Sequence, residues 1–330
     1  MVIQFDREFS AHPPTCGRPE YDAAMPNLAH DFDVAAMLRH EGPLTGAELA
    51  DRTRVEPLAL WRHCRRAPEI SCERIGRRYL RLDRAVEGYA RLSPSIRREF
   101  LTYTVLGLEA NPEPARAKAA ALAREIERIS RDKLELAREI MISVVDGLPE
   151  AESLRAKACF LIGGDVVYGM SHLVPRPESS TGKMVNGSDL DIVVIANDDL
   201  PDSAIKSLDD AIYRKKSYLL MHPSYREEID YIIKRLARVR EQLAFDSLKS
   251  MIACKIMAEG EFLTGNRQIF DTIKELVERS GAAAGIAVLQ ARAISEREQA
   301  EQSLLESDCG LHETGCANLF FTAEEGEEIA

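Results

Sequence analysis

Residues 187–195 place two aspartates at the start of a strongly apolar segment, which reads Gly-Ser-Asp-Leu-Asp-Ile-Val-Val-Ile. A short apolar run of this kind is typical of a buried strand. Side chains two residues apart on a strand point to the same face, so we expect Asp189 and Asp191 to lie side by side. Leu190 and Ile192 would then turn toward the core on the other face.

Two adjacent carboxylates repel each other and are costly to keep ionised without a cation. Hard oxygen ligands suit Mg²⁺ or Mn²⁺, which commonly bridge carboxylates and substrate phosphates. The pattern therefore predicts a divalent metal site at Asp189 and Asp191. A solvated turn that happens to contain two aspartates explains this segment equally well when it is taken alone.

Two further strand patterns accompany this segment. Residues 158–162 predict a short buried strand that ends in Gly163-Gly164, where bare backbone could approach a phosphate and offer N–H groups. Residues 227–234 predict a third strand, which contains Asp230. An aspartate inside an apolar strand is costly to bury unless it is paired or metal-bound. Asp230 is therefore either a further metal ligand or a salt-bridged residue of an edge strand.

The order of these features resembles the DNA polymerase β nucleotidyltransferase superfamily. The family pattern is a hydrophobic residue and two small residues, then Asp-hydrophobic-Asp, then a distant third carboxylate. Ile162-Gly163-Gly164, Asp189-Leu190-Asp191 and Asp230 fill these places. The resemblance covers about residues 155–270, and residues 259–265 are similar to the helix and turn found near such sites.

The resemblance implies that a nucleotidyl group moves from a nucleoside triphosphate to an acceptor, which could be RNA, protein or a small molecule, while pyrophosphate leaves. It implies that Asp189, Asp191 and Asp230 are the catalytic residues and hold Mg²⁺ or Mn²⁺. Asp230 would also assist deprotonation of the acceptor. The nucleotide-binding residues would be Gly163, Gly164, Ser188 and Lys183.

The chain departs from the family between the glycines and the aspartates, where 25 positions separate Gly164 from Asp189. This insertion is either a flap that brings Lys183 or Arg176 to a triphosphate, or a disordered segment, or a sign that the glycine turn is misaligned. Asp165 also stands where the family often has serine. The insertion is not a P-loop, because Pro177 occupies the required glycine position and a methionine follows Lys183.

An arginine-rich stretch predicts a second functional surface. Residues 52–98 contain 13 arginines, five acidic residues and no lysine, in a chain whose formal net charge is −11. Residues 45–67 resemble a helix-turn-helix, and residues 70–82 resemble the strand pair of a winged helix, turning near Gly76. The residues predicted to contact DNA or RNA are Arg62, Arg65, Arg66, Arg74, Arg77 and Arg78. The alternative is a module for protein contact whose arginines pair with the acidic remainder of the chain.

The expected fold class is α+β: an N-terminal winged helix-turn-helix, a helical connector, and a nucleotidyltransferase mixed sheet with flanking helices. The expected parts are an N-terminal arm (1–28), the winged-helix-like domain (29–90), the connector (91–150), the nucleotidyltransferase domain with C-terminal helices (151–305) and an acidic tail (306–330).

The remaining expectations come from composition. An odd count of seven scattered cysteines is no disulfide framework, and the N-terminus lacks a secretory pattern, so we expect a cytoplasmic protein with no membrane partner. Cys309, His312 and Cys316 offer three of the four ligands that structural zinc usually needs. A competing function is a nucleic-acid-binding regulator whose transferase fold is inactive or senses a nucleotide.

Overall fold

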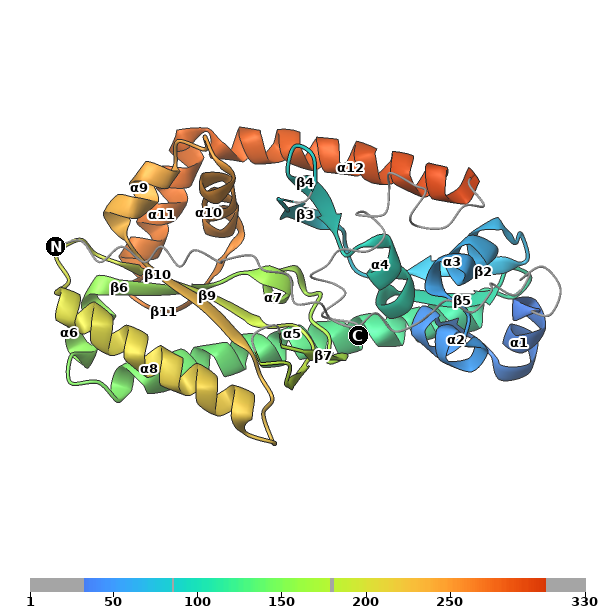
Figure 1. The fold of residues 1–330 in the computed structure, drawn as a ribbon, viewed down its shortest axis with the longest axis horizontal. Helices are drawn as coiled ribbons and strands as arrows, with labels where there is room; N and C mark the ends of the chain where they lie inside the picture. Colours follow the sequence, from blue (N-terminus) through green and yellow to red (C-terminus); the bar gives the residue numbers. More distant parts are fainter. Residues whose placement is uncertain (1–32, 85, 179–180, 307–330) are drawn as a thin grey trace. The chain divides into compact units, whose positions relative to one another are not determined.

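The computed structural model describes residues 33–84, 86–178 and 181–306 (Figure 1). These residues form helices and several small sheets, which confirms the α+β fold class. The predicted N-terminal arm, nearly all of the predicted acidic tail, and Cys309, His312 and Cys316 lie outside the described residues.

The largest sheet has four strands in the order β10-β9-β6-β11. They are β6 (Ala158–Ile162), β9 (Leu190–Ala196), β10 (Ile229–Arg235) and β11 (Glu261–Gly265). Strands β9 and β10 are parallel, while β6 is antiparallel to both β9 and β11. Parallel neighbours need a long crossover, which α8 (Asp202–Met221) supplies. The sheet is therefore mixed, as predicted, but the turn expected at residues 259–265 is an edge strand instead.

Helices cover both faces of this sheet, which explains why β6 is apolar along its whole length. Leu190, Ile192 and Val194 pack on the face shared with α8 and the long helix α5 (Glu113–Asp146). Val193 and Ile195 pack on the opposite face, against four helices. Those helices are α9 (Leu236–Gln242), α10 (Leu248–Glu259), α11 (Arg267–Ser280) and α12 (Ala282–Glu306). The short helices α6 (Ala151–Lys157) and α7 (Gly164–Tyr168) flank β6 in the chain.

The N-terminal helices form where they are expected. They are α1 (Val34–Glu41), α2 (Gly46–Thr53) and α3 (Pro57–Arg66). Thr45 caps α2 in a reciprocal capping box with Glu48, so two otherwise unpaired backbone N–H groups have acceptors. A three-stranded antiparallel sheet accompanies these helices, in the order β1-β5-β2. Its strands are β1 (Leu44–Thr45), β2 (Ile70–Arg74) and β5 (Thr104–Leu108).

The prediction that the strands on either side of Gly76 pair with each other is wrong. Strand β2 pairs with β5, whereas β3 (Tyr79–Leu82) pairs with β4 (Ala90–Ser93). The predicted connector therefore does not begin as a helix at residue 91. Strand β4, helix α4 (Ile96–Tyr103) and strand β5 come first, and only then does α5 run as one helix. Alternating patterns identify strands but not their partners, which explains the error.

The described residues of the insertion before the aspartates contain two strands. Strands β7 (Pro175–Pro177) and β8 (Met184–Asn186) pair as an antiparallel hairpin. The elements from Ala35 onward pack as one compact unit. Among the helices of the described residues, none is both long and apolar enough to cross a membrane.

Candidate active site

The pairing of β9 with β10 brings two of the predicted catalytic residues together. Asp191 lies directly opposite Asp230 in the parallel register, so their side chains share one face of the sheet. Asp189 precedes Asp191 by two residues and turns to the same face. The backbone N–H of Gly163, at the end of β6, donates to the Asp191 carbonyl at 2.9 Å. The ends of three strands therefore meet at the aspartates.

The glycine turn packs tightly against Asp191. Gly164 has a φ of +65°, and a Cβ added there would lie 1.9 Å from Asp191 Oδ2. Only glycine fits both the left-handed backbone and the close approach of the carboxylate. At Gly163 the nearest atom to an added Cβ is Ile256 Cγ2 at 3.6 Å, an ordinary contact. The turn is therefore shaped around the carboxylate of Asp191.

Asp189 and Asp230 oppose the ionisation of Asp191. Burial raises the pKa of Asp191 well above its usual value, and Asp189 and Asp230 raise it further. Burial also raises the pKa of Asp189, which Arg176 partly offsets. Arg81, on β3, lowers the pKa of both. The Asp189 side chain remains 30% exposed, so a cation can reach it.

Asp230 is engaged by a lysine rather than by the other aspartates. Lys216 of α8 donates to Asp230 Oδ1 at 2.8 Å, and the Asp230 side chain is 53% exposed. Within the described residues, no three His, Cys, Asp or Glu side chains converge closely enough to hold a metal as they stand. The backbone thus aligns the aspartates, but Asp230 would have to leave Lys216 to join the other two.

Arg176 is the residue that the inserted hairpin brings to the aspartates. Its guanidinium is buried, donates to the Gly187 carbonyl at 3.0 Å, and lies 3.9 Å from Asp189 Oδ2. It also pairs with Glu228 at 2.9 Å, and burial raises the pKa of Glu228 to about 7. Lys183, in contrast, is exposed and places Nζ 2.8 Å from Met221 Sδ. Of the two cations considered for this hairpin, Arg176 is the one beside the carboxylates.

Ser188 makes its side-chain hydrogen bonds to other residues of the insertion. Its hydroxyl donates to Asp165 at 2.8 Å and accepts from the His172 backbone N–H at 3.3 Å. Asp165 follows Gly164 in the chain and is the centre of a largely buried network. Arg98 pairs with the same carboxylate, and the Tyr79 hydroxyl donates to it. Burial raises the pKa of Asp165, but the Arg98 charge acts together with the hydrogen bonds from Tyr79 and Ser188 and holds that pKa well below its usual range.

Several residues of this region were not identified from the sequence. Arg98 and Tyr79 lie far from Asp165 in the chain, and Tyr79 is on a strand whose pairing was mispredicted. Lys255 of α10 donates to the Tyr168 hydroxyl at 2.9 Å and pairs with Glu259. Burial lowers the pKa of Lys255 below its usual value, although the nearby charge of Asp191 acts in the opposite direction. The only signal in the sequence was Asp165 itself, because a buried aspartate needs a partner.

The six predicted nucleic-acid-binding arginines divide into two groups. Arg62 and Arg66 donate to the carbonyls of Leu304 and Leu305 at 2.6 and 3.0 Å, at the end of α12. Arg78 pairs with Glu99 and with Glu301 of α12. The remaining three, Arg65, Arg74 and Arg77, are exposed. Arg74 also pairs with Glu99 at 3.9 Å, so four of the six contact other parts of the described chain.

Comparison of the chain with protein-family models, with curated proteins and with solved structures found no match.

Proposed function

We propose that this chain is a metal-dependent nucleotidyltransferase with a polymerase β-like catalytic fold and an N-terminal winged-helix-like domain. The observation that supports it most is the register that sets Asp191 opposite Asp230, with Asp189 on the same face. The glycine turn built around Asp191 supports it further, because such a turn leaves backbone free to approach a phosphate.

The donor set fits Mg²⁺ or Mn²⁺, since three carboxylates supply only hard oxygen atoms and the charges of Asp189 and Asp230 raise the pKa of Asp191. Asp189 and Asp191 would hold the ion, with Asp230 as the third ligand. The bound ion would neutralise charge on the transferring phosphate and lower the pKa of the acceptor hydroxyl.

The residues of the chain would orient the reactants. Gly163 and Gly164 admit the phosphates, and Lys255 and Arg81 add positive charge beside Asp191. Asp230 is the most exposed of the three carboxylates and is the group that we assign to accept the acceptor proton. Arg176 holds Asp189 in place from the inserted hairpin.

A second candidate is a regulator that senses a nucleotide without turnover. The pairing of Lys216 with Asp230 favours it, because it removes one carboxylate from the metal ligands. In either case Arg65, Arg74 and Arg77 are the exposed arginines that could contact DNA or RNA.

Incubation of the purified full chain with Mg²⁺ and each labelled nucleoside triphosphate, with and without total RNA, tests the proposal. We expect labelled product and pyrophosphate from the wild type and neither from Asp191→Asn. Calorimetry with excess chelator complements this assay, since a triphosphate facing three carboxylates should bind weakly without a divalent cation. Metal-dependent binding without product would favour the sensor, and equal binding with and without chelator would contradict both functions at this site.

A further inference from the structure

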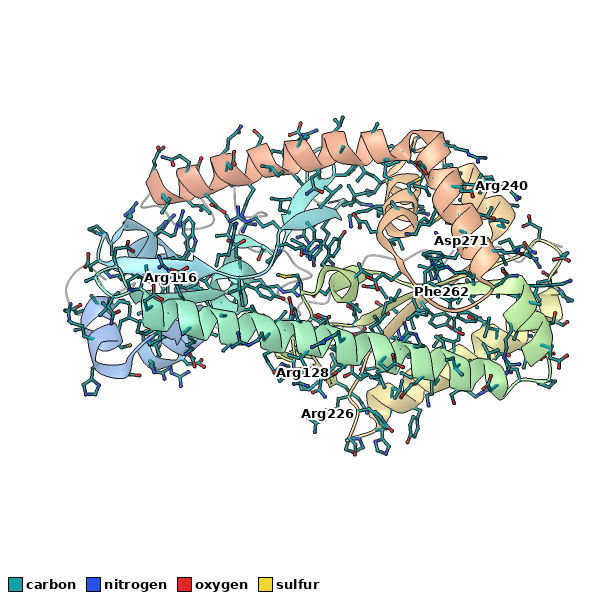
Figure 2. The ribbon with its side chains drawn as sticks, turned by 180° about the vertical axis from the view of Figure 1, so that it is seen from behind. Arg116, Arg128, Arg226, Arg240, Phe262 and Asp271 are labelled. Carbon is teal, nitrogen blue, oxygen red and sulfur yellow. The ribbon has the colours of Figure 1, made fainter. Side chains whose placement is uncertain are left out.

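The turn that connects α8 to β10 carries a cluster of exposed aromatic rings. The ring centroids of Tyr218, His222 and Tyr225 lie 5.1 to 6.1 Å apart, tilted by 42° to 57°. The side chains of Tyr218 and Tyr225 are 50% and 40% exposed. Exposed rings beside one another leave faces on which flat ligands can stack. Figure 2 shows this turn, where Arg226 is labelled.

The same turn is strongly basic. The segment from Tyr213 to Arg226 reads YRKKSYLLMHPSYR, with four Lys or Arg residues and no acidic residue, in a chain of net charge −11. Lys215 Nζ lies 5.6 Å from the centre of the Tyr218 ring. Lys183 of the inserted hairpin also lies next to this turn, because its Nζ contacts the Sδ of Met221. Cations interleaved with aromatic rings are typical of surfaces that bind single-stranded nucleic acid.

Two hydrogen bonds from Asn186 join the turn to the segment that leads into Asp189. The Asn186 backbone N–H donates to the Arg226 carbonyl, and its side-chain amide donates to the Tyr225 carbonyl, both at 2.8 Å. Asn186 precedes Asp189 by three residues. From Tyr225 the chain runs five residues to Asp230, about 16 Å along an extended backbone. A polymer on the rings could therefore place its end at the aspartates.

We propose that the acceptor of the proposed transfer is a single-stranded nucleic acid bound on this surface. Its bases would stack on Tyr218, His222 and Tyr225, which we call the ring platform. Lys183, Lys215 and Arg226 would neutralise its phosphates. The substrate class rests on the proposed function, whereas binding of the strand to the ring platform does not.

In the transfer, the 3′-oxygen of the strand forms a bond to the α-phosphorus of the nucleoside triphosphate. The bond from that phosphorus to the oxygen bridging to the β-phosphate breaks, and its electron pair leaves with pyrophosphate. The hydroxyl proton passes to Asp230, after this carboxylate has separated from Lys216.

Fluorescence anisotropy with a labelled oligouridylate, an oligothymidylate and a DNA duplex tests the binding. The full-length Asp191→Asn variant is used, so that turnover plays no part. We expect both single strands to bind more tightly than the duplex. The logarithm of affinity should fall against the logarithm of salt concentration with a slope of about −2, from three neutralised phosphates. The comparison between RNA and DNA identifies the sugar.

Substitutions separate stacking from other contacts. Tyr218→Ala with Tyr225→Ala should weaken single-strand binding at least about ten-fold, since each stacked base contributes on the order of 1–3 kcal/mol. Tyr218→Phe with Tyr225→Phe keeps both rings and should bind as the parent does. Arg279→Ala, which removes an exposed arginine of α11, should also leave single-strand binding unchanged. No binding of either strand at low salt, or a loss caused by Arg279→Ala instead of the tyrosine pair, overturns the proposal.

Transfer by the protein with an intact Asp191 is then measured separately. Extension of the bound strand at its 3′ end, lost in the tyrosine-to-alanine pair and retained in the phenylalanine pair, supports the acceptor assignment. Transfer to another acceptor at an equal rate in both pairs overturns that assignment but leaves the proposed function intact. Absence of transfer to any acceptor, with ring-dependent binding retained, contradicts the proposed function and not the binding surface.

Discussion

Asp230 lies directly opposite Asp191 in the parallel register of β10 and β9, although 39 positions separate them in the chain. Burial is the largest cause of the raised pKa of Asp191, and the charges of Asp189 and Asp230 raise it further. Carboxylates this close together repel one another, and a bound divalent cation would offset that repulsion.

Asp191→Asn should abolish transfer and leave the metal-free protein at least as stable as the wild type. The amide removes one of the repelling charges while keeping the size of the side chain. Thermal unfolding in chelator and the transfer assay measure the two effects. A variant that transfers at the wild-type rate, or that unfolds well below the wild type, would show that Asp191 does not have this role.

Gly164→Ala should abolish transfer, whereas Gly169→Ala should retain most of it. The two glycines have nearly the same φ, +65° and +66°, so the backbone strain is matched at about 1–2 kcal/mol. An added Cβ meets Asp191 Oδ2 at Gly164 but meets nothing within 4 Å at Gly169. Transfer rates and unfolding curves of both variants test this. Equal losses of activity would mean that the glycine turn does not shape the site.

Arg98→Ala should destabilise the protein by about 3–5 kcal/mol, because it leaves Asp165 as an uncompensated charge in a largely buried network. Arg128→Ala is the matched control, since it removes an exposed arginine that pairs with Glu125 and Asp132 on the same helix (Figure 2). Exposed pairs of this kind contribute little. Urea denaturation of the two variants should differ clearly, and similar midpoints would contradict the assigned role of Arg98.

Protonation of His172 should lower the free energy of unfolding at acid pH. Burial, and then the nearby Arg98 charge, lower the pKa of His172 from 6.5 to about 3. Between these values the unfolded chain binds a proton that the folded chain does not, so stability falls as pH falls below about 6.5. The loss from this group should reach about 2 kcal/mol at pH 5.

His172→Asn provides the comparison, because its side-chain oxygen can accept from the Val174 N–H, as His172 Nδ1 does. Urea denaturation at pH 7 and pH 5 should show a smaller loss in the variant. Parallel losses in both proteins would assign the acid sensitivity to other groups.

Arg62→Ala with Arg66→Ala should loosen the end of α12, whereas Arg65→Ala should not. The first two arginines donate to the Leu304 and Leu305 carbonyls of α12, whereas Arg65 is exposed. Hydrogen exchange in residues 300–306 should become faster by about five-fold or more in the pair, equivalent to about 1 kcal/mol. Unchanged exchange would leave these arginines available for nucleic acid.

The sequence by itself determined the strands around the aspartates. The Asp-Leu-Asp segment, the strand before Gly163 and the strand that contains Asp230 are local patterns, and each formed where it was expected. Local spacing also set Asp189 and Asp191 on one face, since alternation along a strand needs no tertiary information.

Tertiary structure decided which of these elements meet. The choice of β5 as the partner of β2 depends on hydrogen bonds between residues 30 to 38 positions apart, and alternation cannot encode it. A fragment of residues 29–90 would therefore lack the central strand of the N-terminal sheet. The pairing of Arg98 with Asp165, the capture of Arg62 and Arg66 by α12, and the pairing of Asp230 with Lys216 have the same origin. A charge in the sequence has no partner until folding brings one near, and burial then makes that partner necessary.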